Sequence, residues 1–154
     1  MEIWIRTTVI ALVIHLFVVP PVWAALGQSI ASIERDRAAM GGQARSSFGK
    51  GYSIETITVA GMTINEYMLP DGVVFAVTWK GTGTPNLPLL FGTYFDEYTE
   101  GITAHRKSRP RTRKHLTMKT THLVVERGGH SRFMWGRAFI PALLPSAISP
   151  QDIR

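Results

Sequence analysis

The stretch Val73-Val-Phe-Ala-Val-Thr-Trp79 decides the fold of this 154-residue chain. Its two alternating sets of side chains are both largely apolar: Val73, Phe75, Val77 and Trp79 in one set, and Val74, Ala76 and Thr78 in the other. Side chains of a β-strand alternate between the two faces of a sheet, so this pattern predicts a central strand that is covered on both sides. We expect the hydrophobic core to form around it.

The residues on either side of this strand predict further elements. Residues 52–80 are rich in β-branched and aromatic side chains and are divided by Ala60-Gly61 and by Pro70-Asp71-Gly72, which are turn signals, so three antiparallel strands are expected. Asn86 can cap a following helix. The apolar stripe of that helix has helical spacing and is expected to pack on the sheet; it comprises Leu87, Leu90, Phe91, Tyr94, Phe95 and Tyr98.

Residues 121–139 predict a β-hairpin around Gly128-Gly129, a pair that suits a two-residue turn. This turn would pair Arg127 with His130, Val125 with Arg132, and Leu123 with Met134. The chain then runs through two prolines into a tail that we expect to be irregular or to form single turns.

A second helix is expected over residues 29–40, capped by Ser29 and ended by Gly41-Gly42. The small and polar residues that follow, up to Gly51, are interpreted as a flexible connection. The predicted fold is therefore α+β, with an antiparallel sheet of about five strands and two helices packed on it.

The first 24 residues have the layout of a signal peptide. An apolar run over residues 8–19 is followed by Pro20-Pro21 and by Val22-Trp-Ala24, which fits a small-residue cleavage site. The run is too short for a bilayer, which needs about 20 apolar residues. We expect cleavage after Ala24, a single domain over residues 25–154 in the periplasm or secreted, and no integral membrane span after cleavage. An uncleaved anchor is the alternative.

Composition favours one globular domain, because 45% of the residues are hydrophobic and 18% are charged. The chain has no cysteine, which excludes disulfides and attachment of lipid through an N-terminal cysteine. Stability must come from packing, since a chain of this size buries about two-thirds of its unfolded surface.

The positive charge is concentrated in one place. Residues 25–154, which exclude Glu2 and Arg6, hold 16 Lys and Arg against 10 Asp and Glu. The whole excess lies within residues 106–114, which contain Arg106, Lys107, Arg109, Arg111, Arg113 and Lys114. A local cluster of this kind attracts anions, so these six side chains are candidates for binding an anionic surface.

Three partners fit the basic segment, residues 106–114: an anionic envelope surface, an acidic polysaccharide or an acidic protein. Nucleic acid is unlikely, because residues 99–132 contain no Phe, Tyr or Trp on which bases could stack. The alternative is that the basic segment is a solvated loop that binds no partner. We also expect Arg106 and Lys107 to fold back over Glu97 and Glu100, carboxylates near the end of the predicted helix.

No constellation in the sequence predicts catalysis. Asp96 and Glu100 are expected to face water, and residues 25–154 have four histidines and no cysteine, so no metal or other cofactor is expected. A non-enzymatic binding or structural module of the envelope is the favoured function. The alternative is a small enzyme or a protein that binds a small anion, with His130, Arg132 and Trp135 as the candidate residues.

A set of short motifs is scattered along residues 25–154: Ala25-Leu-Gly27, residues 70–79, Tyr94-Phe95, Gly128-Gly-His130, Arg132, Gly136-Arg-Ala138, Pro141, Leu143-Leu-Pro145 and residues 149–154. With these motifs the chain resembles a family of short exported bacterial proteins, domain of unknown function family 2844. The resemblance spans nearly all of residues 25–154, is weakest over residues 105–119, and implies an exported protein of proteobacterial type with no assigned activity.

Overall fold

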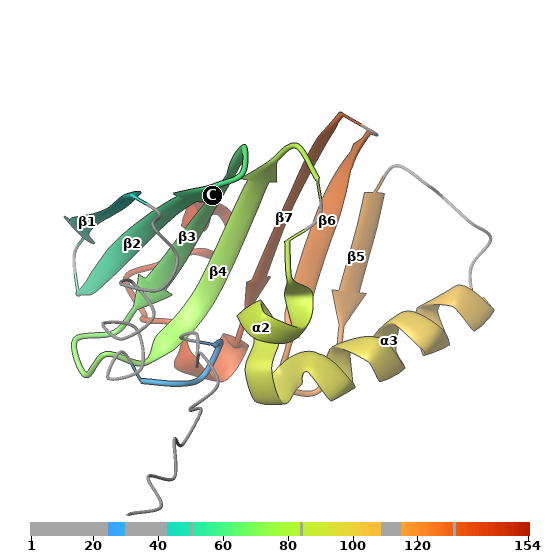
Figure 1. Cartoon of the computed structure of the whole chain (residues 1–154). Helices are drawn as coiled ribbons and strands as arrows, with labels where there is room; N and C mark the ends of the chain where they lie inside the picture. Colours follow the sequence, from blue (N-terminus) through green and yellow to red (C-terminus); the bar gives the residue numbers. More distant parts are fainter. Residues whose placement is uncertain (1–24, 30–42, 50, 84, 109–114, 131) are drawn as a thin grey trace, which may run out of the picture.

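The computed structural model describes residues 25–29, 43–49, 51–83, 85–108, 115–130 and 132–154. In this part of the chain, seven strands form one antiparallel sheet in the order β1-β2-β3-β4-β7-β6-β5 (Figure 1). The α+β class is confirmed, and the expected number of about five strands is corrected to seven. The expected signal peptide lies outside the described residues, as does the expected helix over residues 29–40 apart from Ser29.

The central strand is β4 (Val74–Gly81), which pairs with β3 (Met62–Met68) on one side and β7 (Phe133–Phe139) on the other. Val77 and Trp79 pack into a core on the helix side of the sheet, while Phe75 and Ala76 belong to a second core on the opposite side. The expectation of a central strand covered on both faces is confirmed. So are the three antiparallel strands, which include β2 (Tyr52–Val59). The expected alternation is wrong at Phe75, which lies on the face opposite Val77 and Trp79 because the register with β3 shifts beside it.

One face of the sheet is covered by helices (Figure 1). These are α2 (Leu87–Phe91), a 3-10 turn (Gly92–Tyr94) and α3 (Phe95–Ser108). The Asn86 side chain caps α2 by accepting a hydrogen bond from the Leu89 N–H, as predicted. The apolar stripe packs on the sheet, with the Phe91 ring 5.9 Å from that of Trp79 and 4.9 Å from that of Tyr98.

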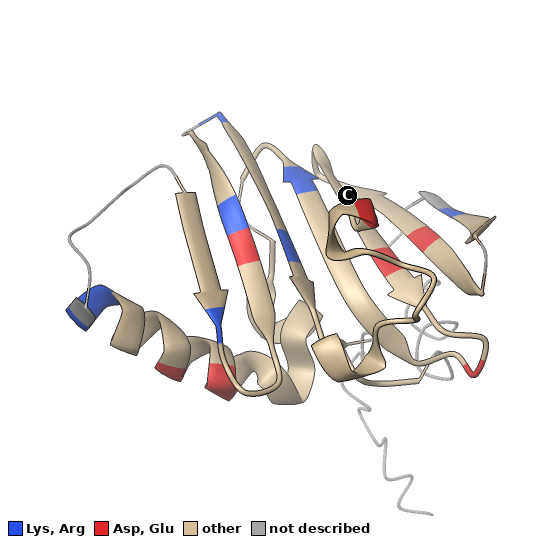
Figure 2. Cartoon of the chain, turned by 180° about the vertical axis from the view of Figure 1, so that it is seen from behind, with Lys and Arg blue, Asp and Glu red and all other residues tan. Residues whose placement is uncertain are grey.

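The opposite face of the sheet is covered by the C-terminal segment, residues 140–154 (Figure 2). Its 3-10 turns, Pro141–Leu143 and Pro150–Asp152, confirm the predicted single turns. Sequence patterns did not predict that this segment packs against the sheet. Ile148 and Ile153 are buried there against the second core.

The hairpin forms, but its predicted register is wrong. His130 at the end of β6 (Val124–His130) pairs with Phe133, and Arg127 pairs with Gly136, so Gly128 and Gly129 lie within the paired strand and not at the turn. Gly129 is a strand residue with φ +127°, and a Cβ there would lie 2.2 Å from the Phe133 carbonyl oxygen. Gly129 therefore allows the two backbones to approach closely, and it does not mark the turn.

The two strands that the sequence patterns did not predict lie at the edges of the sheet. Residues expected to form a flexible connection contain β1 (Gln43–Gly49), which pairs with β2. Similarly, β5 (His115–Lys119) directly follows the basic segment and pairs with β6. An edge strand buries little apolar surface, so its sequence can be polar. The sequence of such a strand therefore looks like that of a loop.

The first described residues pack against the end of the central strand. The Leu26 N–H donates to the Leu90 carbonyl and the Gly27 N–H to the Val74 carbonyl, and Leu26 is fully buried. Ser29 forms an isolated bridge with Val73. Among the described residues, no helix has the length and apolar character needed to cross a membrane.

Candidate functional site

The first candidate site is the C-terminal end of α3. Arg106 and Lys107 are exposed in the last turn of this helix. Arg106 lies nine residues beyond Glu97 and six beyond Glu100 on one continuous helix, about 13 Å and about 9 Å along the axis, so the chain does not fold back over the carboxylates as we expected. That expectation is wrong because the helix continues to Ser108. The other four candidates in the basic segment, Arg109, Arg111, Arg113 and Lys114, lie outside the described residues.

Charge is segregated along α3 (Figure 2). Asp96 and Glu97 occupy its first turn, and His105, Arg106 and Lys107 occupy its last turn. This order complements the helix dipole, which favours acidic groups at the N-terminus and cations at the C-terminus. It also leaves the positive charge together at one end of the helix. Asp96 and Glu100 are exposed, as predicted.

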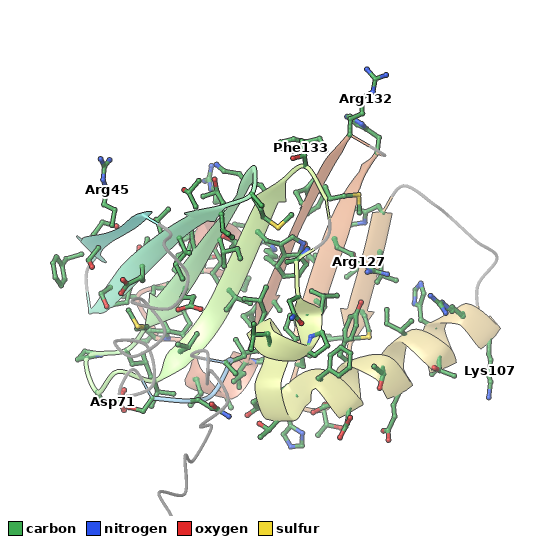
Figure 3. The ribbon with its side chains drawn as sticks, viewed as in Figure 1. Arg45, Asp71, Lys107, Arg127, Arg132 and Phe133 are labelled. Atoms are coloured by element: carbon green, nitrogen blue, oxygen red, sulfur yellow. The ribbon has the colours of Figure 1, made fainter. Side chains whose placement is uncertain are left out.

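A third described cation lies beneath the N-terminal half of α3, and the sequence did not single it out. Arg127 on β6 has its guanidinium carbon 6.0 Å from the centre of the Tyr98 ring (Figure 3). Burial raises the pKa of the Tyr98 hydroxyl, and the charges of Arg127 and Arg106 oppose that rise. The Tyr98 ring thus joins Arg127 of β6 to the N-terminal half of α3. Arg127 became visible as a candidate only once β6 was placed beneath the helix.

Glu97 has a structural role instead. Its Oε1 accepts a hydrogen bond of 2.9 Å from the His122 backbone N–H, and its Oε2 lies 3.3 Å from His122 Nδ1. The nearby Thr120 hydroxyl and then His122 hold the pKa of Glu97 below its ordinary value, against the opposing effect of partial burial. The carboxylate thus ties α3 to the loop between β5 and β6.

Among the described residues, the three candidates for a small ligand lie in different surroundings. His130 and Arg132 are exposed, and Arg132 points away from the molecule beyond the turn (Figure 3). Their one described contact is a 3.4 Å hydrogen bond from the Arg132 N–H to His130 Nδ1. Trp135 differs, because it is half-buried and lines a cleft on the face that carries the C-terminal segment.

Arg137 holds the C-terminal segment beside this cleft. Its Nε and Nη2 donate to Glu126 Oε2 at 3.1 and 2.9 Å, and its Nη1 donates to the carbonyls of Pro150 and Ile153. The Tyr67 hydroxyl donates to the main-chain oxygen of Arg154. Burial raises the pKa of Tyr67, which keeps this donor protonated.

Two buried carboxylates were also missed by the sequence reasoning. Glu55 on β2 and Glu66 on β3 are direct cross-strand partners, and their side chains are buried. Each has an interaction partner. Burying a polar group without a partner is costly, and these interactions offset that cost. The described residues contain no cluster of three or more His, Asp or Glu that could hold a metal ion.

Fold and surface together define a small α+β protein with an antiparallel sheet, a basic helix end on one face and a cleft on the other. The family model described as Protein of unknown function (DUF2844) matches residues 22–153, and the chain belongs to this family. No curated protein and no solved structure matches the chain.

Proposed function

We propose that this chain is a non-enzymatic binding module of the bacterial envelope that attaches reversibly to anionic surfaces through its basic segment. The observation that carries the proposal is the end of α3, where Arg106 and Lys107 are exposed at one edge of the molecule (Figure 1). The next seven residues of the sequence add four more cations. The envelope location rests on the signal-like residues 1–24.

Energetics support reversible attachment. Each Lys or Arg close to an anionic membrane contributes about 1 kcal/mol, so several acting together give useful affinity without a buried interface. Charges of this kind are screened over about 10 Å at 0.1 M salt, so binding must weaken as salt rises.

Co-sedimentation with vesicles tests the proposal. The full chain is expected to pellet with vesicles of phosphatidylglycerol mixed with phosphatidylcholine at low salt, and much less at high salt or with phosphatidylcholine alone. The triple variant Arg106→Gln, Lys107→Gln, Arg109→Gln should lose most of the salt-sensitive binding. Residues 1–24 are the same in every variant, so differences between variants report charge and not the apolar N-terminus.

A matched control separates local from total charge. The variant Arg45→Gln, Lys119→Gln, Arg132→Gln removes the same charge from exposed positions away from the basic segment. It should bind almost as the unmodified chain does. Equal loss in the two variants would show that only net charge matters, and binding that is insensitive to salt would contradict the proposal directly.

A further inference from the structure

The second surface of interest is a cleft on the face of the sheet opposite the helices. The C-terminal segment lies on this face (Figure 2). It has a volume of about 350 Å³, which is at the lower end of the range for small-molecule sites. Its floor comes from β4 and β7, and residues 151–154 form its wall. This face is separate from the basic end of α3, so the two surfaces can be tested independently.

An aromatic shelf forms part of the floor. Trp135 on β7 pairs with Gly128 on β6, which pairs in turn with His115 on β5. Gly128 has no side chain, so the two rings meet above it with their centres 5.5 Å apart. The indole is half-buried and lines the cleft, and it presents an apolar surface with a fixed position.

Charged and polar groups surround this shelf. Lys80 is the cross-strand neighbour of Trp135 on the other side, and its side chain is exposed. Arg154 and Gln151 line the cleft from the C-terminal segment and are also exposed. The charge of Arg137 is paired with that of Glu126, and Lys80 and Arg154 are further cations that line the cleft.

We propose that this cleft binds one acidic sugar unit of the uronic acid type. The flat indole suits the C–H face of a sugar ring, because aromatic side chains combine a large apolar surface with a fixed geometry. Lys80 and Arg154 attract the carboxylate, and charge-assisted contacts are the strong ones. Glu126, whose Oε2 is held by Arg137, and Gln151 are placed to bond hydroxyl groups.

Calorimetric titration of the full chain with a galacturonic acid dimer tests this proposal. We expect measurable binding, about tenfold weaker in Lys80→Gln, in Trp135→Leu and for the neutral galactose dimer. Lys119→Gln is the matched control, since Lys119 is also an exposed strand lysine but does not line the cleft. Its affinity should be unchanged. Lys80→Gln changes an exposed side chain, so its result stands even if Trp135→Leu fails to fold.

Several outcomes would overturn the assignment. The cleft is not a uronate site if the acidic dimer does not bind, or if Lys80→Gln and Lys119→Gln weaken it equally. Tighter binding of adenosine monophosphate or of inorganic phosphate would assign a different class of ligand. The triple variant of Arg106, Lys107 and Arg109 provides a further test. If it loses dimer binding while Lys80→Gln retains it, the sugar binds to the basic segment and not to the cleft.

Discussion

Glu97 shows how a single side chain connects elements that are distant in the sequence. It lies in the first turn of α3, yet its hydrogen-bond partner, His122, is 25 residues further along. Carboxylates in the first turn of a helix already gain from its dipole, and a charge-assisted bond to a backbone N–H adds to that gain. Glu97 is therefore expected to stabilise the docking of α3 on the sheet.

The variant Glu97→Gln should lower the stability of the fold by about 1 kcal/mol at pH 7, or about 3 °C in melting temperature. The pKa of Glu97 is lowered in the folded state. Its contribution is thus present above the ordinary value of 4.5 and is lost as the pH falls through the lower folded-state pKa. Thermal unfolding at pH 7 and pH 3 should show a difference that shrinks in acid.

Glu100→Gln is the control for this measurement, because Glu100 is exposed on the same helix and carries the same charge. It should change the melting temperature little at either pH. If both variants lose the same stability at pH 7, the effect belongs to the general charge of the helix and not to the contact with His122.

At the scale of elements, the C-terminal segment depends on Arg137. This side chain joins β7 to β6 through Glu126 and to the segment through two carbonyls. Tyr67 adds a contact from β3 to Arg154. Without these bonds the segment would rest on a few apolar contacts, chiefly those of Ile148 and Ile153.

Arg137→Met should destabilise the fold by about 2 kcal/mol, because it removes charged hydrogen bonds and leaves Glu126 without its partner. The C-terminal segment should also become more sensitive to proteolysis. Urea unfolding and limited digestion measure the two effects. Arg132→Met, at an exposed position in the same hairpin, should leave both unchanged, and a similar loss in both variants would refute the assigned role of Arg137.

At the scale of the whole molecule, the sequence was sufficient for the elements that are apolar on at least one face. The apolar run around Phe75 and the helical stripe around Phe91 both correspond to buried side chains. β1 and β5 were not predicted, because an edge strand has one neighbour and can be almost entirely polar. The register error at Gly129 arose because glycine permits close backbone approach as readily as it permits a turn.

The two surfaces differ in how far the sequence could predict them. The basic segment is evident from charge alone, since its six cations lie within nine residues. The cleft is not evident, because Lys80, Trp135 and Arg154 come from parts of the chain that meet only through the strand order and the folded-back C-terminal segment. No local sequence pattern indicates that these three residues come together. Among them, only Trp135 was a candidate site residue in the sequence analysis.

Hydrogen–deuterium exchange of the full chain, with and without phosphatidylglycerol vesicles, tests the central claim most directly, because it reports which surface meets the membrane. The proposal predicts slower exchange near the end of α3 and through the following residues up to β5. It predicts no change in β2 and β3. Protection centred on β1 or on the C-terminal segment, or no protection beyond residues 1–24, would contradict attachment through the basic segment.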